Sequence, residues 1–404
     1  MNTQNKKPNI RFNQFKELWK VVKLDSISQK VKSKNINNSF ENVLTNSAEF
    51  GIVPQRDFFD KDIANLKSLS GYYVVQPNDF VYNPRISNKA PVGPIKANFL
   101  NITGVMSPLY YVFRTQNIDV FFLAKYFDSS YWHKFMKLNG DTGARSDRFA
   151  IKDSVFKEMP IPFPSLAEQS IIGSLFRTLD DLLSSYKDNL TNYQSFKTTM
   201  LSKMFPKAGQ SVPEIRLDGF EGDWKEQTLG SLGSVAMNKR IFKNETSENG
   251  DIPFYKIGTF GGTADAFISK EKFQEYKEKY PYPEIGDILI SASGSIGRTV
   301  VYNGEDAYYQ DSNIVWLKHD QQLDNSYLKQ YYGIIKWSGI EGTTIKRLYN
   351  KNILETNIFL PPSVAEQQAI GAYFSNLDNF INSHQEKISQ LETLKKKLLQ
   401  DMFI

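Results

Sequence analysis

Cysteine is missing from all 404 residues, which excludes disulfide bonds, thiolate metal sites and cysteine nucleophiles. The sequence also lacks any run of 18 apolar residues, so we expect no transmembrane helix and no membrane partner. Its first residues are polar and do not form the apolar segment of a signal peptide. These absences predict a cytoplasmic protein, and the length allows two or three domains.

Motifs for catalysis and cofactor binding are scarce as well. There is no phosphate-binding Gly-x-x-x-x-Gly-Lys-Ser/Thr, no Gly-x-Gly-x-x-Gly that opens a helix, and no Asn/Asp-Pro-Pro-aromatic motif of an amino-methyltransferase. The only histidines, His133, His319 and His384, do not have the spacing of a metal site, and we interpret His384 as a residue of a helical seam. Residues 271–279 read as a charged surface stretch and residues 291–297 as a polar hairpin or turn. We therefore expect a binding function, with no catalytic residue, cofactor or metal.

What the sequence does contain is an internal repeat. Residues 8–20 recur 205 positions later at 213–225 with the same proline, Ile-Arg, phenylalanine and Trp-Lys. Residues 164–169 and 362–367, which are 198 positions apart, share Pro-Ser-x-Ala-Glu-Gln. Two copies of one module predict a pseudo-dimer, which suits a target with two halves. Because the first segment repeats the central linker, we also expect the two ends of the chain to lie close together.

Two long helices are the clearest structural prediction. Apolar residues at spacings of three and four run from Ile172 to Met204 and again from Ile370 to Met402, which is typical of a coiled coil of about five heptads. Each segment opens with Ser-x-x-Glu, which predicts a capping box at Ser165/Glu168 and Ser363/Glu366. A helix of about 37 residues is roughly 55 Å long. Two matched stripes favour pairing within the chain over pairing between chains, and a pseudo-twofold relation between the halves makes that pair antiparallel.

The rest of the chain predicts two mixed domains. Strands expected near residues 79–83 and 109–114 have counterparts at 287–291 and 313–318, and an amphipathic helix follows each second strand. We predict an α+β protein with a first domain at 1–164, a spacer helix at 165–205, a linker and second domain at 206–364, and a spacer helix at 365–404. Residues 1–164 carry a net charge of +9, which suits phosphate, whereas 206–364 carry −3.

Polar loops in both predicted domains interleave basic, amide and hydroxyl groups. Such side chains read base edges, because arginine grips guanine, asparagine or glutamine grips adenine, and serine or threonine serves either. For each residue alone, an ordinary surface loop is an equally good interpretation, but the loops recur at matched positions of the two copies. The candidate DNA-binding residues are Gln55, Arg56, Lys61, Asn83, Arg85, Lys89, Thr142, Arg145, Ser146, Arg148, Lys256, Thr259, Ser291, Ser293, Arg298, Thr343, Thr344, Lys346 and Arg347.

These paired segments resemble the specificity subunits of type I restriction–modification enzymes over essentially the whole chain. The most specific similarities are the two Pro-Ser-x-Ala-Glu-Gln segments and the two Arg…Phe…Trp-Lys segments, while residues 50–55 and 79–83 look like a common type of target-recognition domain. The resemblance implies two target-recognition domains that each read one half of a bipartite asymmetric DNA site, with the helices as a ruler for the gap. It also implies methyltransferase subunits that carry S-adenosylmethionine, two per chain, and translocase–nuclease restriction subunits as partners.

Two other functions stay open at this point. One is a self-contained methyltransferase or nuclease, against which the missing motifs argue. The other is a coiled-coil adaptor or decoy that binds a methyltransferase without reading DNA. Sequence preference of the reconstituted complex separates the adaptor from a specificity subunit.

Overall fold

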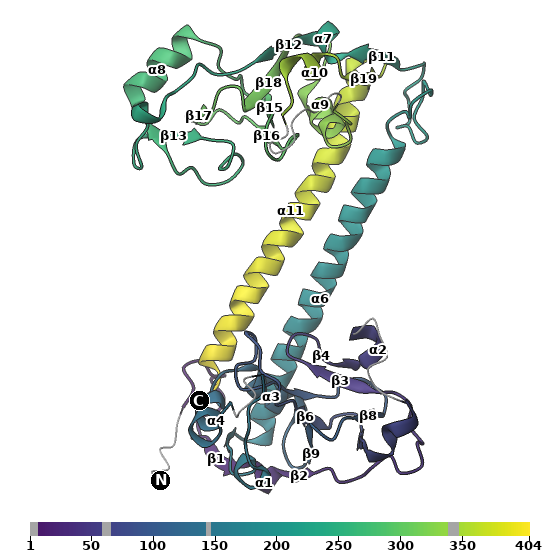
Figure 1. The fold of residues 1–404 in the computed structure, drawn as a ribbon, viewed down its shortest axis with the longest axis vertical. Coiled ribbons are helices and arrows are strands. Elements are labelled where there is room, and N and C mark those ends of the chain that lie inside the picture. The colour runs from purple at the N-terminus through teal and green to yellow at the C-terminus, as the bar shows by residue number, and fades with distance from the viewer. Residues whose placement is uncertain (1–6, 59–65, 143–146, 338–346) are drawn as a thin grey trace. The chain divides into compact units, whose positions relative to one another are not determined.

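The computed structural model describes residues 7–58, 66–142, 147–337 and 347–404. The chain forms two compact units, the first made of Met1–Lys187 with Glu386–Ile404 and the second of Asp188–Gln385. Each unit holds one mixed domain and part of both long helices, α6 (Leu166–Lys203) and α11 (Val364–Asp401) (Figure 1). The predicted α+β class with two long helices is therefore confirmed. The unit boundaries divide each helix, whereas the predicted segments keep each helix whole.

The domain of the first unit is built around the antiparallel sheet β2-β9-β6-β7. Its strands are β1 (Lys20–Lys23), β2 (Ser28–Lys30), β3 (Leu44–Ser47), β4 (Gly51–Pro54), β5 (Tyr73–Val75), β6 (Phe80–Tyr82), β7 (Ile95–Ala97), β8 (Gly104–Met106), β9 (Tyr111–Thr115) and β10 (Pro160–Phe163). Its short helices are α1 (Leu24–Ile27), α2 (Gln55–Phe58), η1 (Leu66–Gly71), α3 (Val120–Asp128), α4 (His133–Asn139) and α5 (Asp153–Phe156). The strands predicted near residues 79–83 and 109–114 are β6 and β9, and the predicted helix is α3.

The domain of the second unit repeats this plan with the sheet β12-β18-β15-β16, and its pair β11-β19 corresponds to β1-β10. Its strands are β11 (Lys225–Thr228), β12 (Gly233–Ala236), β13 (Ile252–Tyr255), β14 (Phe267–Ile268), β15 (Ile288–Ser291), β16 (Thr299–Val301), β17 (Tyr308–Tyr309), β18 (Ile314–His319) and β19 (Asn357–Leu360). Its helices are α7 (Leu229–Leu232), η2 (Lys243–Glu245), α8 (Lys270–Lys279), α9 (Asn325–Tyr332) and α10 (Asn350–Leu354). The expected charged stretch at 271–279 lies in α8, and residues 292–298 form the expected hairpin turn between β15 and β16.

The end of each long helix is buried in a domain core. In the first unit Phe403 is 2% exposed, and its ring centroid lies 5.5 Å from that of Phe122 and 6.1 Å from that of Phe176. In the second unit the counterpart Phe205 lies 6.2 Å from both Trp224 and Phe374. The aromatic residue therefore joins both helices to the domain of its unit.

As expected, the first described residues of the chain lie against the end of α11 within the first unit. The backbone N–H of Ile10 donates to the carbonyl of Asp401 over 2.9 Å, and the Asn9 side chain donates to the Asp401 carboxylate. In the second unit the N–H of Ile215 makes the same bond to Lys203, also over 2.9 Å. Ile10 and Ile215, which are equivalent in the repeat, therefore make the same backbone bond to the last residues of a long helix, α11 in the first unit and α6 in the second.

The long helices run antiparallel within each unit. In the first unit Asp180 binds Lys395 over 2.5 Å and Lys187 binds Glu392 over 2.6 Å, so the α11 numbers fall as the α6 numbers rise. In the second unit the contacts are Lys197 with Asp378 over 2.5 Å and stacked rings of Tyr193 and Phe380 at 5.7 Å. The Asp180–Lys395 and Asp378–Lys197 pairs are equivalent under the 198-residue repeat. The ring of His384 also contacts Tyr193, as expected of a residue in the seam.

The predicted capping boxes form only in part. The hydroxyls of Ser165 and Ser363 accept from the N–H groups of Glu168 and Glu366 over 3.3 and 3.2 Å, which caps the first turns. The glutamate carboxylates do not turn back to the serines. Glu168 instead accepts two hydrogen bonds from Arg11, over 2.6 and 2.7 Å. A salt bridge to a distant arginine has replaced the second half of each box.

The glutamine and glycine that follow each Ala-Glu in the helices α6 and α11 also serve the scaffold. The side-chain oxygens of Gln169 and Gln367 accept from the N–H groups of Asp119 and Asp324 over 2.8 Å, which ties each long helix to the start of α3 or α9. A Cβ atom on Gly371 would lie 1.9 Å from the hydroxyl oxygen of Ser326, so only glycine allows this approach. The repeated signature of the sequence is therefore explained by packing.

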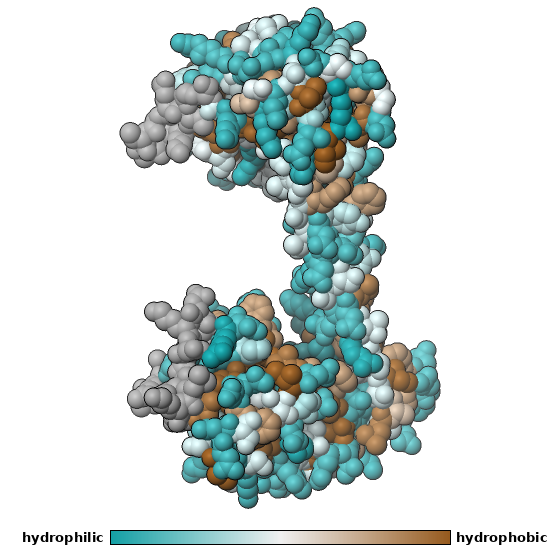
Figure 2. Space-filling view, turned by 90° about the vertical axis from the view of Figure 1, so that its right-hand side faces the viewer, coloured by the Kyte–Doolittle hydropathy of each residue, from teal (hydrophilic) through white to brown (hydrophobic). Residues whose placement is uncertain are grey.

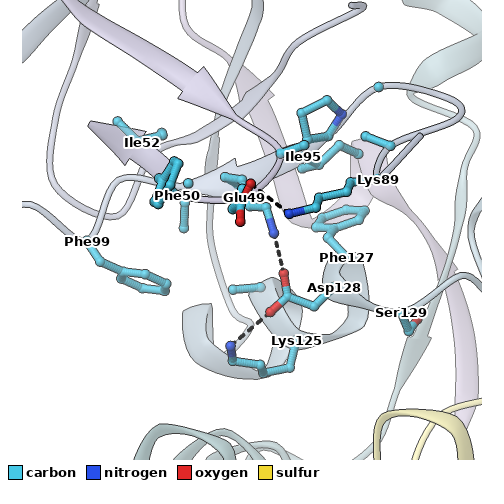
Figure 3. Close-up of a pocket in the computed structure, with 18 of the residues that line it drawn as sticks. Glu49, Phe50, Ile52, Lys89, Ile95, Phe99, Lys125, Phe127, Asp128 and Ser129 are labelled. Atoms are coloured by element: carbon cyan, nitrogen blue, oxygen red, sulfur yellow. Dashed lines mark hydrogen bonds and ion pairs between the residues drawn. The ribbon is translucent and has the colours of Figure 1, made fainter. Parts of the chain in front are cut away.

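A row of ion pairs with alternating charges lies beside a cavity of about 680 Å³ in the first unit (Figure 3). The carboxylate of Asp128 binds Lys96 over 2.7 Å and Lys125 over 2.9 Å, and Lys125 also binds Asp180 over 2.7 Å. Burial alone would raise the pKa of Asp128, but the two ammonium groups outweigh it and lower the pKa to about 2. This row of ion pairs links β7, α3 and the helix pair.

We predict that the variant Asp128→Asn loses about 2 kcal/mol of unfolding free energy at pH 7. Because the folded-state pKa lies below that of the unfolded chain, the stabilisation is present above pH about 4 and disappears as the pH falls towards 2. Urea unfolding at several pH values measures it, and the difference between variant and parent should fall by about half at pH 3. A difference that does not change with pH would contradict an ionic origin.

The surface of the helix pair is mostly hydrophilic on the face that Figure 2 shows. Four residues of the predicted apolar stripe remain exposed: Leu182 (41%), Phe196 (46%), Phe380 (52%) and Leu394 (44%). A pair of helices buries only a narrow seam, so residues at its edge stay in contact with water. Within the described residues, none of the helices combines the length and apolar character needed to cross a membrane.

Candidate nucleic-acid interface

In the first unit, the backbone joins two of the predicted loops. Arg85 and Arg148 form an isolated bridge, the N–H of Ile86 donates to Asp147 over 3.0 Å, and the N–H of Phe149 donates to Pro84 over 2.8 Å. Loops that lie far apart in sequence thus present Arg85 and Arg148 side by side. No spacing in the sequence indicates this contact.

A cavity of about 440 Å³ lies beside these loops and is lined by Asn83, Arg85 and Lys89. The amide of Asn83 is already engaged, because its nitrogen donates to the Asn46 carbonyl over 2.8 Å and its oxygen accepts from the N–H of Arg85 over 3.0 Å. Gly93 has φ +81°, and a Cβ there would lie 2.2 Å from the Asn83 carbonyl oxygen, so only glycine fits beside Asn83. Asn83 therefore shapes the loop, while Arg85 and Lys89 line the same cavity.

The cations of this cavity are held by exposed carboxylates. Lys89 binds Glu49 over 2.7 Å, and Arg85 lies 3.9 Å from the carboxylate of Asp147. Exposed pairs of this kind contribute about 1 kcal/mol or less, so a phosphate can compete for either cation. Sequence reasoning missed Glu49, as it missed Asn46, Phe58 and Tyr110, which also line the cavity.

The other predicted residues of the first unit that the structure describes do not line this cavity. Gln55 and Arg56 open α2, whose last residue Phe58 lines the cavity. Thr142 is exposed at the end of the described part of its loop. Three further candidates fall outside the described residues: Lys61, Arg145 and Ser146.

In the second unit, the hairpin after β15 meets the segment that leads to α10. Ser293 and Arg347 form a bridge, and both side chains donate to the amide oxygen of Asn313, over 2.7 and 3.4 Å. Ser291 is 1% exposed, donates to the Ser295 carbonyl and accepts from the N–H of Arg298, so its hydroxyl holds the turn. Asn313, which sequence reasoning assigned only to a strand, is the centre of this cluster.

Two further predicted positions join the same turn. The guanidinium of Arg298 donates to the carbonyl of Phe260 over 2.9 Å, which brings the hairpin to the turn 256–259. There the Thr259 hydroxyl accepts from the N–H of Lys256 over 3.1 Å, and the Lys256 ammonium binds Asp265 over 2.8 Å. Three predicted residues lie outside the described part of the chain: Thr343, Thr344 and Lys346.

The chemistry of these loops is that of hydrogen bonding and charge. Arg85, Arg148, Arg298 and Arg347 are the guanidinium groups of the two clusters, and Ser293 and Asn313 add hydroxyl and amide groups. Among the residues described by the structure, no group of three or more histidine, aspartate or glutamate side chains could hold a metal ion. The fold and the loops define a protein of two similar α+β modules on a helix pair, each with one polar loop cluster.

Comparisons with known proteins agree with this class. Residues 221–393 match the family described as Type I restriction modification DNA specificity domain. A putative type I restriction enzyme specificity subunit from Haemophilus influenzae, S.HindORF215P, is 43% identical over 241 residues, which are 59% of this chain and 61% of that protein. The MjaVIII specificity subunit of Methanocaldococcus jannaschii is 22% identical over 62% of each chain. This chain spans about three fifths of the length of the first curated relatives that it matches.

Solved structures share the fold. The S subunit of a type I restriction–modification system from M. genitalium aligns with a TM-score of 0.60 at 16% identity, over 98% of this chain and 99% of that one. A chain from a study of complex assembly and conformational transition in the type I system aligns with a TM-score of 0.52 at 17% identity, over 95% and 97%. Residues 221–393 thus match the type I DNA specificity domain family, and the chain as a whole shares the fold of a type I S subunit.

Proposed function

We propose that this chain is the non-catalytic DNA-recognition subunit of a type I restriction–modification complex. Each domain reads one half of a bipartite asymmetric site in double-stranded DNA, and the helix pair sets the unread gap. Two methyltransferase subunits per chain, which supply S-adenosylmethionine, and restriction translocase–nuclease subunits are the partners. This function belongs in the cytoplasm, where the DNA is.

The observation that carries the proposal is the pair of loop clusters. In each unit, backbone bonds join loops that carry arginine. They bring Arg85 to Arg148 in the first unit, and in the second they bridge Arg347 to Ser293, in the hairpin that ends at Arg298. Guanidinium groups on the ends of loops are suited to guanine edges and to phosphates. Because the loop sequences of the two modules differ, each cluster would read a different half-site.

The equal lengths of the helices support the ruler. α6 and α11 each contain 38 residues, and their interhelical Asp–Lys pairs are equivalent under the repeat. A helix of that length spans about 57 Å. One turn of DNA is about 34–36 Å long, so a spacer of this size suits half-sites in successive major grooves.

Methylation mapping tests the proposed function. A host that expresses the chain with its methyltransferase should carry N6-methyladenine at one bipartite motif with a fixed gap. Arg85→Ala together with Arg148→Ala should relax or abolish the requirement for one half of the motif while the other half is kept. Methylation at no motif by an intact complex would favour the adaptor that binds the methyltransferase without reading DNA.

Shortening the spacer tests the ruler. Deletion of residues 186–192 and 384–390 removes one heptad from each helix, or about 10 Å. We expect the gap in the methylated motif to shrink by about 3 base pairs, or methylation to be lost because the half-sites no longer face their domains. Deletion from α6 alone serves as the control and should prevent a matched helix pair. Full methylation with an unchanged gap would rule the ruler out.

A further inference from the structure

The two repeats differ at the arginine that binds the start of each long helix. Arg216 grips Glu366 with two bonds of 2.7 and 2.8 Å, and it also donates to the carbonyls of Gly222 over 2.7 Å and Glu221 over 2.9 Å. Arg11 grips Glu168 in the same way. Its Nη1 is buried, however, and has no hydrogen-bond partner among the described residues. A buried N–H group without an acceptor costs about 1–3 kcal/mol.

Two glycines explain why the second repeat satisfies its arginine. Gly219 and Gly222 have φ angles of +86° and +85°, which lets the loop turn its carbonyls towards Arg216. Their counterparts 205 residues earlier are Gln14 and Glu17, for which this backbone conformation is costly. Neither of them adopts a positive φ. The first repeat therefore cannot copy the loop that fills the acceptor positions.

The loops of the two repeats pack differently against the proline that precedes each long helix. A Cβ on Gly222 would lie 3.3 Å from Cγ of Pro362, so that loop lies against the residues that begin α11. Beside the counterpart Pro164, a cavity of about 500 Å³ is lined by Arg11, Leu18 and other residues of the first loop. Leu18 is 50% exposed at this cavity. The loop of the second repeat thus packs against Pro362, whereas the counterpart Pro164 borders a cavity.

The charges of the two positions are opposite. The first cavity is lined by three cations and two carboxylates: Arg11, Lys16, Lys20, Glu17 and Glu168. The counterpart in the second repeat has two cations and three carboxylates: Arg216, Lys225, Glu221, Asp223 and Glu366. Lys16 and Leu18 thus stand where the second repeat has Glu221 and Asp223. An acidic segment complements the first position, whereas the second already contains one.

We propose that the cavity beside Arg11 is a docking site for an acidic loop of a partner protein, which supplies a main-chain carbonyl to Nη1 and carboxylates to Lys16 and Lys20. The occupant is identified by the second repeat, where main-chain carbonyls of the acidic segment 221–223 fill the same position. The partner must displace the side chains that cover Nη1, and most of that loop is exposed. Since the second repeat is filled by its own loop, the partner docks at one repeat only.

A peptide taken from the chain itself provides the probe. The octapeptide Leu-Asp-Gly-Phe-Glu-Gly-Asp-Trp reproduces residues 217–224. It is titrated into the full chain carrying ¹⁵N-labelled arginine, with the Arg11 resonance assigned from the Arg11→Lys variant. We expect a saturable shift of the Arg11 side-chain resonance and none of Arg216. No shift of Arg11 at millimolar peptide would overturn the proposal.

Three controls separate docking from general charge attraction. Lys16→Glu should weaken peptide binding by about tenfold. A variant in which residues 12–18 are replaced by those of 217–223 should not bind, because its own loop then fills the cavity; if it does not fold, Lys16→Glu carries the test. A peptide with lysine in place of both acidic residues after phenylalanine should not bind. Unchanged binding in these controls, or a shift of Arg11 by a DNA duplex but not by the peptide, would contradict the proposal.

Discussion

Replacing Glu168 by alanine should lower the unfolding free energy of the first unit by about 3–5 kcal/mol, because it leaves the Arg11 guanidinium charged and without its partner. The pair is well shielded from water, with side-chain exposures of 6% for Arg11 and 1% for Glu168. Arg11 donates two hydrogen bonds to Glu168, which raise the pKa of the arginine above its usual value. Without Glu168 the guanidinium still stays charged, because arginine keeps its proton at any ordinary pH. The loss should also free residues 8–20 from the start of α6.

The second repeat offers a matched control for this variant. Glu366→Ala removes the same carboxylate, but Arg216 keeps its bonds to two backbone carbonyls and is 17% exposed. We expect a smaller loss of about 1–3 kcal/mol. Hydrogen exchange with mass spectrometry in low denaturant measures each unit separately. Equal losses in both variants would mean that burial and the extra carbonyls do not matter.

Replacing Phe403 by alanine should destabilise the first unit by about 3–5 kcal/mol, the cost of a cavity left by a buried aromatic ring. The ring contacts Phe122, Tyr126 and Phe176 at centroid distances of 5.5, 6.0 and 6.1 Å, and it is 2% exposed. The variant removes the residue that joins the end of α11 to the domain core. We expect faster exchange of amides in α3 and in residues 386–401.

Leu394→Ala is the control on the same helix. Leu394 is 44% exposed, so its truncation should change the unfolding free energy by less than about 1 kcal/mol. Phe205→Ala tests the equivalent position and should act on the second unit instead, where Phe205 packs on Trp224 and Phe374. If Phe403→Ala unfolds no more easily than Leu394→Ala, the helix end does not belong to the core.

Periodicity and repeats predicted most of the scaffold. The helix beginnings expected at Ser165 and Ser363 lie one residue before α6 and α11, because serine caps and proline stops act locally in the sequence. The prediction that each glutamate completes a capping box was wrong. Arg11 lies 157 residues from Glu168 in the sequence, and no local pattern indicates such a partner. The Asp180–Lys395 ion pair was not predicted for the same reason.

The candidate sites were less accessible to sequence reasoning. Residue types suggested loops that could bind DNA. Whether a hydroxyl or amide group is available to bind DNA depends on the contacts that it makes in the folded chain. Ser291 and Asn83 were chosen for their chemistry, and both have their polar atoms engaged by neighbouring backbone groups. Asn313 and Glu49 were missed, because a strand residue and an acid do not look like DNA contacts. Which of the described candidates touch bases remains a prediction.

The placement of Phe403 has a consequence for synthesis on the ribosome. The second unit is one continuous stretch, Asp188–Gln385, whereas the first unit needs residues from both sides of that stretch. Translation at about 5–20 residues per second leaves residues 1–187 waiting for roughly 10–40 s before Glu386 and the residues after it are made. During that interval Phe122 and Phe176 lack the ring that covers them. The half of the protein that is translated first is therefore the half that closes last.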